Sequence, residues 1–145
     1  MIGEDDAEGR MRVIMSYGII FINFAFVLYT VGVWSEKIQG KLKLGHVILF
    51  WLGIICDVIG TLAMGEIAKQ HLQDSRLLYY VPISRDFHSL TGSIALALML
   101  LHTCWATVIL LNHKEVWIIK FHRYSFIVWL IWLLPFISGA IFHLM

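Results

Sequence analysis

The stretch FHSLTGSIALALMLLHTCWATVILL, at residues 87–111, decides the fold of this chain. Its 25 residues contain no acid, lysine or arginine, and two histidines are its only basic side chains. A helix of about 20 apolar residues is enough to cross the hydrocarbon core of a bilayer. The stretch therefore predicts a membrane-spanning helix.

Three further apolar stretches predict spans at residues 13–34, 46–68 and 116–144. The 145 residues are 59% hydrophobic with a mean hydropathy of +0.78, which a water-soluble domain of this size does not tolerate. We expect one domain of the all-α class, a four-helix transmembrane bundle with up-down-up-down topology, in a multi-pass membrane protein. Residues 1–12 lack the basic start of a signal peptide, so we expect a polar N-terminal tail before a retained first span.

The charged residues and the cysteines exclude several kinds of site. The net charge is +1 and the basic residues are spread over the connections, so nucleic acid is not an expected partner. The distribution of basic residues favours cytoplasmic first and third connections only slightly. Cys56 and Cys104 fall inside spans without a CxxC or CxxCH context. We expect both to be small apolar fillers rather than part of a disulfide, a zinc cluster or a covalent haem attachment.

His88 and His102 are the most informative residues of the third span. They are 14 residues apart, so both leave the same helix face, separated by roughly 21 Å along the axis. Ionisable side chains are costly in hydrocarbon and normally face the bundle interior, and imidazole is a common ligand of haem iron. The same face carries residues that leave room for a bulky group: Gly92, Ala95, Met99 and Ala106.

His122 is the predicted partner of His102. A tight turn around Asn112 puts the two histidines at equal distances along the chain from the turn, and so at nearly the same depth on antiparallel neighbours. Two imidazoles so placed suit the axial positions of one iron, with haem b as the non-covalent cofactor. If the fourth helix instead begins only near His122, that residue lies at the membrane edge and binds nothing.

The other histidines leave further alternatives open. His46 begins the second span on the same side, either as an alternative ligand or as a partner of the haem propionates. His88 lies towards the opposite side, where it would either hold a second haem or form hydrogen bonds at the membrane edge. A second haem there would take its other ligand from His143 or, in the polar connection, from His71. His113 lies in the turn and is expected to be exposed.

Asp57 is the only acid deep in a predicted span. A buried acid needs a partner or a proton, so we expect a functional or ligand-orienting role for it. Steps of three and four put it on one helix face with a set of other residues: His46, Phe50, Gly53, Gly60 and Met64. The two glycines of this face would admit either a neighbouring helix or a flat cofactor.

Polar residues recur every seven positions in the first span, at Ser16, Asn23 and Thr30. Side chains of this kind often form hydrogen bonds between membrane helices. We expect them to mark the side of this helix that faces the bundle, without a chemical role.

Several segments resemble one family. They are YTVGVWSEKIQG at 29–40, HxxxFWLGxxxDxxGTxxM at 46–64, FHxxTG at 87–92, MxxHxxWA at 99–106 and FHRYS at 121–125. Together these segments resemble the HsmA-type bacterial haem-binding membrane proteins over about residues 13–140. The resemblance implies a four-helix membrane protein associated with haem binding and with tolerance of haem or oxidative stress. It also points to a set of candidate haem-binding residues: His46, His88, His102 and His122.

Three functions remain open at this point. The first is a haem b-binding protein of the bacterial cytoplasmic membrane that sequesters haem and defends against oxidants. The second is a b-type cytochrome, an oxidoreductase or a subunit of one, that carries electrons across the bilayer to a quinone, superoxide, iron or another redox partner. The third is a small proton-coupled transporter that uses Asp57 and His102 without haem. The sequence permits a homo-oligomer in each case.

Overall fold

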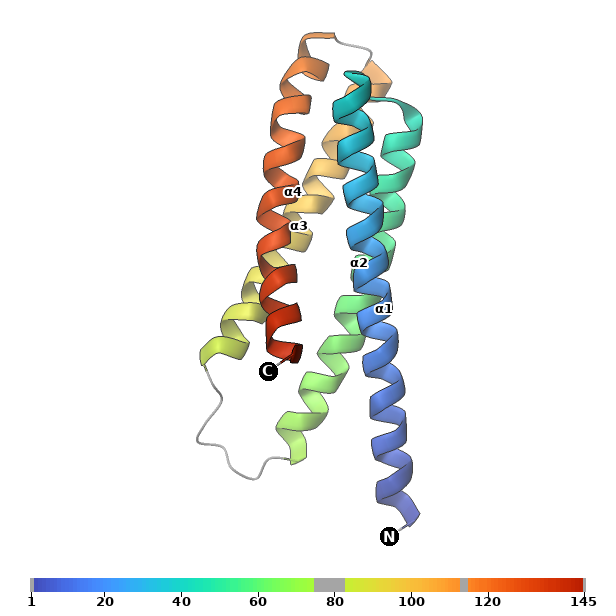
Figure 1. Ribbon diagram of the computed structural model, residues 1–145, viewed down its shortest axis with the longest axis vertical. Coiled ribbons are helices and arrows are strands. Elements are labelled where there is room, and N and C mark those ends of the chain that lie inside the picture. Colours follow the sequence, from blue (N-terminus) through green and yellow to red (C-terminus); the bar gives the residue numbers. More distant parts are fainter. Residues whose placement is uncertain (1, 75–82, 113–114, 145) are drawn as a thin grey trace.

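Four long antiparallel helices make up the protein (Figure 1). The computed structural model describes residues 2–74, 83–112 and 115–144. The helices are α1 (Ile2–Gln39), α2 (Leu44–Asp74), α3 (Ile83–Asn112) and α4 (Glu115–Leu144). The predicted all-α, up-down-up-down bundle is confirmed. Helix α1 also continues through the segment that we expected to be a polar tail.

Each helix contains a stretch long and apolar enough to cross a membrane: Glu8–Gln39, Leu44–Ile67, His88–Asn112 and Arg123–Ile141. The distribution of side chains agrees with such a location. Large apolar residues such as Phe24 and Leu101 are exposed on the outside, whereas Asp57 and His102 are buried. In water this arrangement would be unfavourable, but in lipid the apolar exterior is solvated. The chain is therefore a multi-pass membrane protein.

The connection between α1 and α2 is short. Gly40 ends α1 with a positive φ of 60°, and its N–H donates to the carbonyl of Glu36 at 3.0 Å. A glycine in this left-handed conformation is a common C-terminal cap of helices, because a side chain there would be strained. The cap turns the chain back at once, so α1 and α2 form a tight antiparallel hairpin.

Helices α1 and α2 share the most extensive interface of the bundle, and α1 and α4 share the least. Glycines allow the close approach of α1 and α2: Gly53 makes room for the ring of Tyr29, and Gly60 makes room for Ile22. A side chain at either glycine would collide with these neighbours. The sequence predicted that these glycines admit either a neighbouring helix or a flat cofactor. In the structure they admit the neighbouring helix.

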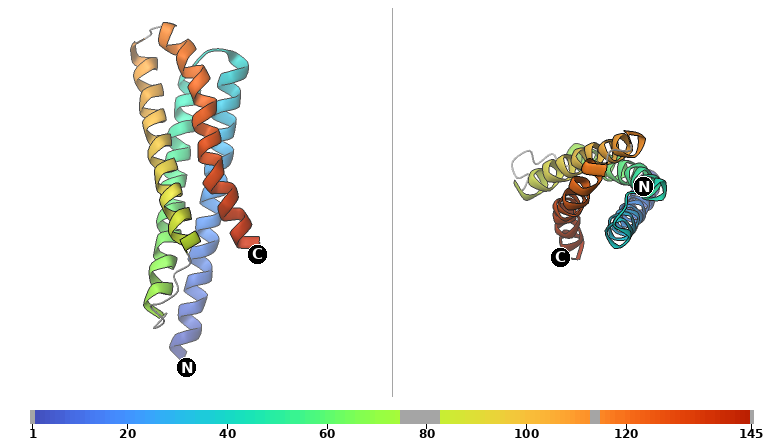
Figure 2. Two further views of the ribbon diagram at one scale, coloured as in Figure 1. Left: turned by 90° about the vertical axis from the view of Figure 1, so that its left-hand side faces the viewer. Right: turned by 90° about the horizontal axis from the view of Figure 1, so that it is seen from above.

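The core is concentrated towards the end of the bundle where α1 joins α2 and α3 approaches α4. Towards the other end the helices diverge, as Figures 1 and 2 show. The predicted inward placement of the polar residues of α1 is wrong for two of the three. Ser16 and Asn23 are exposed, and each side chain donates to a carbonyl of its own helix, whereas Thr30 is half-buried and accepts from Trp129. The reason is that α4 diverges from α1 at the depth of Ser16 and Asn23 and does not cover them.

Helix α4 contains a proline in its interior. Pro135 is buried and cannot donate a hydrogen bond to the carbonyl one turn earlier. Its own carbonyl accepts from the hydroxyl of Ser138 at 2.9 Å. The stacked ring contact between Phe26 of α1 and Phe136 of α4 lies next to this proline.

Candidate functional site

The predicted inward faces of α2 and α3 are confirmed. Their buried members are His46, Phe50, Gly53, Asp57 and Gly60 in α2, and Ala95, Met99, His102 and Ala106 in α3. In α4, Trp129 is buried, and Phe136, seven residues later on the same face, is half-buried. The buried side chains of His46, Asp57 and His102 thus lie on the faces that the helical periodicity predicts.

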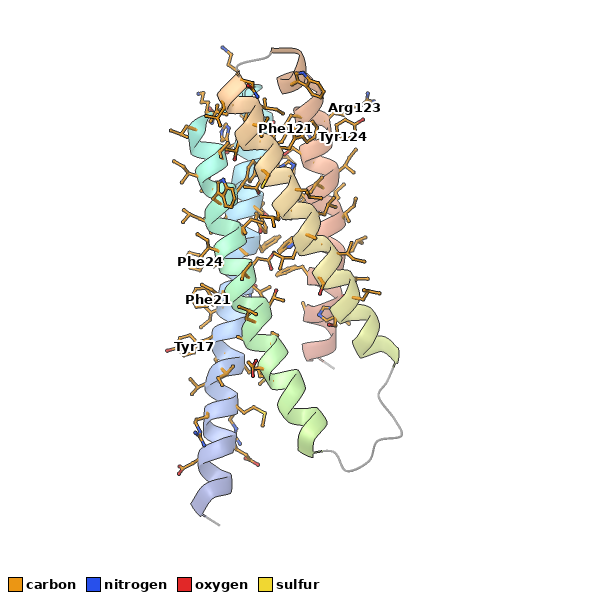
Figure 3. All side chains as sticks on the ribbon, turned by 180° about the vertical axis from the view of Figure 1, so that it is seen from behind. Tyr17, Phe21, Phe24, Phe121, Arg123 and Tyr124 are labelled. Carbon is orange, nitrogen blue, oxygen red and sulfur yellow. The ribbon has the colours of Figure 1, made fainter. Side chains whose placement is uncertain are left out.

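His102 lies at the centre of a small aromatic cluster. Its imidazole stacks on the ring of Phe121, with centroids 4.6 Å apart and planes 16° apart, and meets the ring of Phe50 edge-on at 5.1 Å. Trp105 also meets the ring of Phe121, with centroids 5.3 Å apart. Figure 3 shows Phe121 near the upper end of the bundle, next to Tyr124. The imidazole is therefore held among apolar rings from α2, α3 and α4.

The two ring nitrogens of His102 have different surroundings. Nε2 lies 3.3 Å from the hydroxyl oxygen of Ser125, but Nδ1 is buried and has no hydrogen-bond partner among the described residues. A buried polar atom without a partner costs free energy, so such an atom in a native site requires an explanation. An imidazole held by a hydrogen bond at one nitrogen and open at the other is the usual state of a metal-ligating histidine.

His46 is also buried, one helical turn from Phe50, but its nitrogens are arranged differently. Its Nδ1 accepts a hydrogen bond from the backbone N–H of Lys43 at 3.1 Å. In the neutral ring the proton is then on Nε2, which becomes a donor. Glu36 of α1 lies close enough for its charge to act on His46, and its side chain is only 1% exposed. This geometry suits His46 to binding an acidic group rather than a metal.

Glu36 is a site residue that the sequence analysis missed. It stands between Ser35 and Lys37 at the end of a span, a position typical of solvated interfacial charges. The only signal was its spacing of seven residues from Tyr29, which puts the two on one face of α1. Both prove to be buried.

The pairing of His102 with His122 stays a prediction, for which the structure gives backbone positions only. Helix α3 ends at Asn112 and α4 begins at Glu115, so the turn lies where we expected it. Residue 122 belongs to the same turn of α4 as Phe121 and Ser125, the two residues of that helix that contact His102. The side chain of His122 lies outside the described residues.

His88 occupies the other end of α3, away from His102. Its Nδ1 lies 3.0 Å from the hydroxyl of Ser138, and its ring packs against Gly139, where a side chain would collide with it. His88 thus docks α3 on α4 in a space left by a glycine. His113 and the side chains of His71 and His143 lie outside the described residues.

Asp57 joins three helices. Its Oδ2 accepts one hydrogen bond from the indole N–H of Trp132 in α4 at 2.8 Å and another from the hydroxyl of Tyr29 in α1 at 3.4 Å. The two donor rings contact each other edge-on, with centroids 5.1 Å apart. The expectation that this acid needs a partner is met by two donors, neither of which the sequence analysis identified.

Among the described residues, no three histidine, cysteine, aspartate or glutamate side chains gather as ligands for a bare metal ion. Haem has a lesser requirement, because the porphyrin supplies four ligands and the protein supplies one or two. Cys56 and Cys104 are both free, as predicted. No family model, curated protein or solved structure matches the chain.

Proposed function

We propose that this chain is a haem b-binding protein of the bacterial cytoplasmic membrane that sequesters haem and defends against oxidants. One observation carries the proposal: the buried Nδ1 of His102 has no protein partner, while the hydroxyl of Ser125 holds the other nitrogen. The resemblance of the sequence to HsmA-type proteins supports the same function. His102, the residue of this observation, is also one of the four histidines that the resemblance indicates.

The residues around His102 fit haem. His102 would supply a nitrogen ligand to the haem iron, with His122 as the proposed second ligand from the neighbouring helix. Ser125 would orient the imidazole, and the rings of Phe50 and Phe121 provide the apolar surface that a flat ligand prefers. His46, with its proton on Nε2, would donate to a propionate carboxylate instead of binding iron. When bound, haem supplies one-electron chemistry.

A second candidate is a b-type cytochrome that carries electrons across the bilayer to a quinone or a redox partner. The observation in its favour is His88, a second partly buried imidazole at the opposite end of the same helix face. A proton-coupled transporter remains the alternative without haem. In that alternative Asp57 would have to release the two donors that it now binds.

The test is an absorption spectrum of the purified full-length protein, with a haem-to-protein ratio. We expect non-covalent haem b with a six-coordinate, low-spin spectrum, since two nitrogen ligands favour that state. His102→Ala should lose most of the haem. His71→Ala should keep it, because residue 71 lies beyond the candidate span of α2.

A colourless preparation that also fails to take up added haemin would reject haem binding and favour the transporter. Equal haem content in the His102→Ala and His71→Ala variants would remove His102 from the site. Rapid oxidation of a quinol by the haem-loaded protein would favour the cytochrome.

A further inference from the structure

Tyr29 and Trp132 share one acceptor atom in the middle of the bundle. Both donate to Oδ2 of Asp57, and both are buried, with Tyr29 fully enclosed. A phenylalanine at position 29 would fill the same space beside Gly53 and Trp132. Beyond this packing, the hydroxyl adds a hydrogen bond to Asp57 and, with it, a removable proton next to a carboxylate.

A series of indole rings leads from this pair to the end of the bundle. Trp129 lies one turn from Trp132 on the same face of α4, and its N–H donates to Thr30 at 3.2 Å. Its ring meets the ring of Trp34 in α1, with centroids 6.5 Å apart. Trp34 is 43% exposed, and the ammonium of Lys37 lies over its ring. Oxidisable rings thus extend from the buried carboxylate to the membrane surface.

We propose that Tyr29, Trp132, Trp129 and Trp34 form a redox relay, with Asp57 as its proton acceptor. Tyr29 gives one electron to an organic peroxyl radical formed in the surrounding lipid, which becomes a hydroperoxide anion, and its phenolic proton passes to the Asp57 carboxylate. The products are a neutral phenoxyl radical, a carboxylic acid and the reduced oxidant.

The relay then returns to its starting state. An electron passes from Trp34 through Trp129 and Trp132 to the phenoxyl radical, and Asp57 gives the proton back to the phenolate oxygen. A water-soluble one-electron reductant such as ascorbate then reduces the oxidised Trp34 at the surface. Electrons and protons therefore balance over the cycle, and an oxidising equivalent leaves the bundle without damaging it.

The geometry of Asp57 distinguishes this relay from simple aromatic packing. Buried indole and phenol groups need only one acceptor each, and threonine or backbone oxygens commonly serve. Here both converge on a carboxylate, a base in a region where an ionisable group is costly. The shared base couples the proton to whichever ring loses an electron.

The test uses the full-length, haem-free protein in detergent, so it does not depend on haem binding. A photo-excited ruthenium bipyridine complex with persulfate oxidises exposed rings, and the samples are frozen for electron paramagnetic resonance. Exposed tyrosines such as Tyr124 are oxidised directly and their radicals decay quickly, so we expect a long-lived tyrosyl radical signal that Tyr29→Phe removes. Tyr17→Phe is the matched control and should keep the signal, because Tyr17 lies on the exposed outer side of α1 (Figure 3).

Two further variants test the roles of the neighbours. Asp57→Asn should lose the Tyr29 signal, because an amide does not accept the proton, and Trp129→Phe should reduce it by interrupting the route from the surface. Helical circular dichroism and size-exclusion profiles are compared to verify that each variant is folded. A signal in folded Tyr29→Phe equal to that of the wild type would overturn the relay, as would a signal that Asp57→Asn leaves unchanged.

Discussion

The Ser125 hydroxyl and the His102 imidazole meet across the interface of α3 and α4, with Oγ and Nε2 3.3 Å apart. Both residues are buried, and among the described residues this hydroxyl is the hydrogen-bond partner of Nε2, whereas Nδ1 has none. The contact fixes the orientation of the ring and leaves Nδ1 as the open nitrogen. Ser125 is therefore the residue that prepares His102 for a ligand.

We expect Ser125→Ala to weaken haem binding without abolishing it. Loss of a partner that orients a metal-ligating histidine typically costs about 10–100-fold in affinity. Haemin titration of the purified protein measures the change. Ser93→Ala is the control, because the exposed Ser93 hydroxyl bonds only to the carbonyl of Ser89 in its own helix. Equal affinities for the two variants would show that Ser125 does not orient the ligand.

His88→Ala should leave the haem content unchanged, at one haem per chain. The ring of His88 already bonds to Ser138 and packs on Gly139, so its role in the structure is to dock α3 on α4. Pyridine haemochrome analysis gives the ratio for the wild type and the variant. A ratio of two that falls to one in His88→Ala would establish a second haem and favour the electron-carrying cytochrome.

Asp57→Ala should destabilise the bundle. The substitution leaves the indole N–H of Trp132 and the hydroxyl of Tyr29 buried without an acceptor, which costs about 1–3 kcal/mol in the free energy of unfolding. Asp57→Asn should cost less, because the amide oxygen still accepts. Unfolding by sodium dodecyl sulfate in mixed micelles measures both, with the exposed Asp6→Ala as the control. A stability for Asp57→Ala equal to that of the control would contradict this account.

Two glycines of α2 should respond in opposite ways to alanine. A methyl group at Gly53 collides with the ring of Tyr29, and such overpacking costs about 1–3 kcal/mol. A methyl group at Gly65 meets nothing within 4 Å, so the better helix propensity of alanine should stabilise that variant by up to about 1 kcal/mol. The same unfolding assay compares them. Equal stabilities of the two variants would contradict the close approach of α1 to α2 at Gly53.

The periodicity of the sequence predicted the arrangement of the helices and much of the site. His46, Asp57 and His102 were expected to face inwards because their spacing matches apolar neighbours on the same face, and all three are buried. The residues that the sequence did not reveal, Glu36 and Ser125, act through partners on other helices. Such partners depend on helix rotation and depth, which one-dimensional spacing does not define.

At Asn23 the sequence predicted a contact that the structure does not have, because this residue was expected to face the bundle. Its heptad spacing with Thr30 correctly identified one side of α1, but the divergence of α4 leaves that side exposed at the depth of Asn23. Periodicity reports which residues share a face. Whether a neighbour covers that face along its whole length is a property of the tertiary structure.

The proline in α4 has a consequence for how a ligand reaches the interior. Pro135 removes a backbone hydrogen bond beside the ring contact of Phe136 with Phe26, and so creates a point at which α4 can bend away from α1 while its C-terminal segment stays docked on α3. We expect a flat apolar molecule dissolved in the bilayer to enter sideways there. Pro135→Ala should slow haemin uptake measured by stopped flow yet leave the final occupancy unchanged, whereas the exposed Leu134→Ala should alter neither. Equal uptake rates for the two variants would mean that the ligand enters by another route, from the aqueous ends of the bundle.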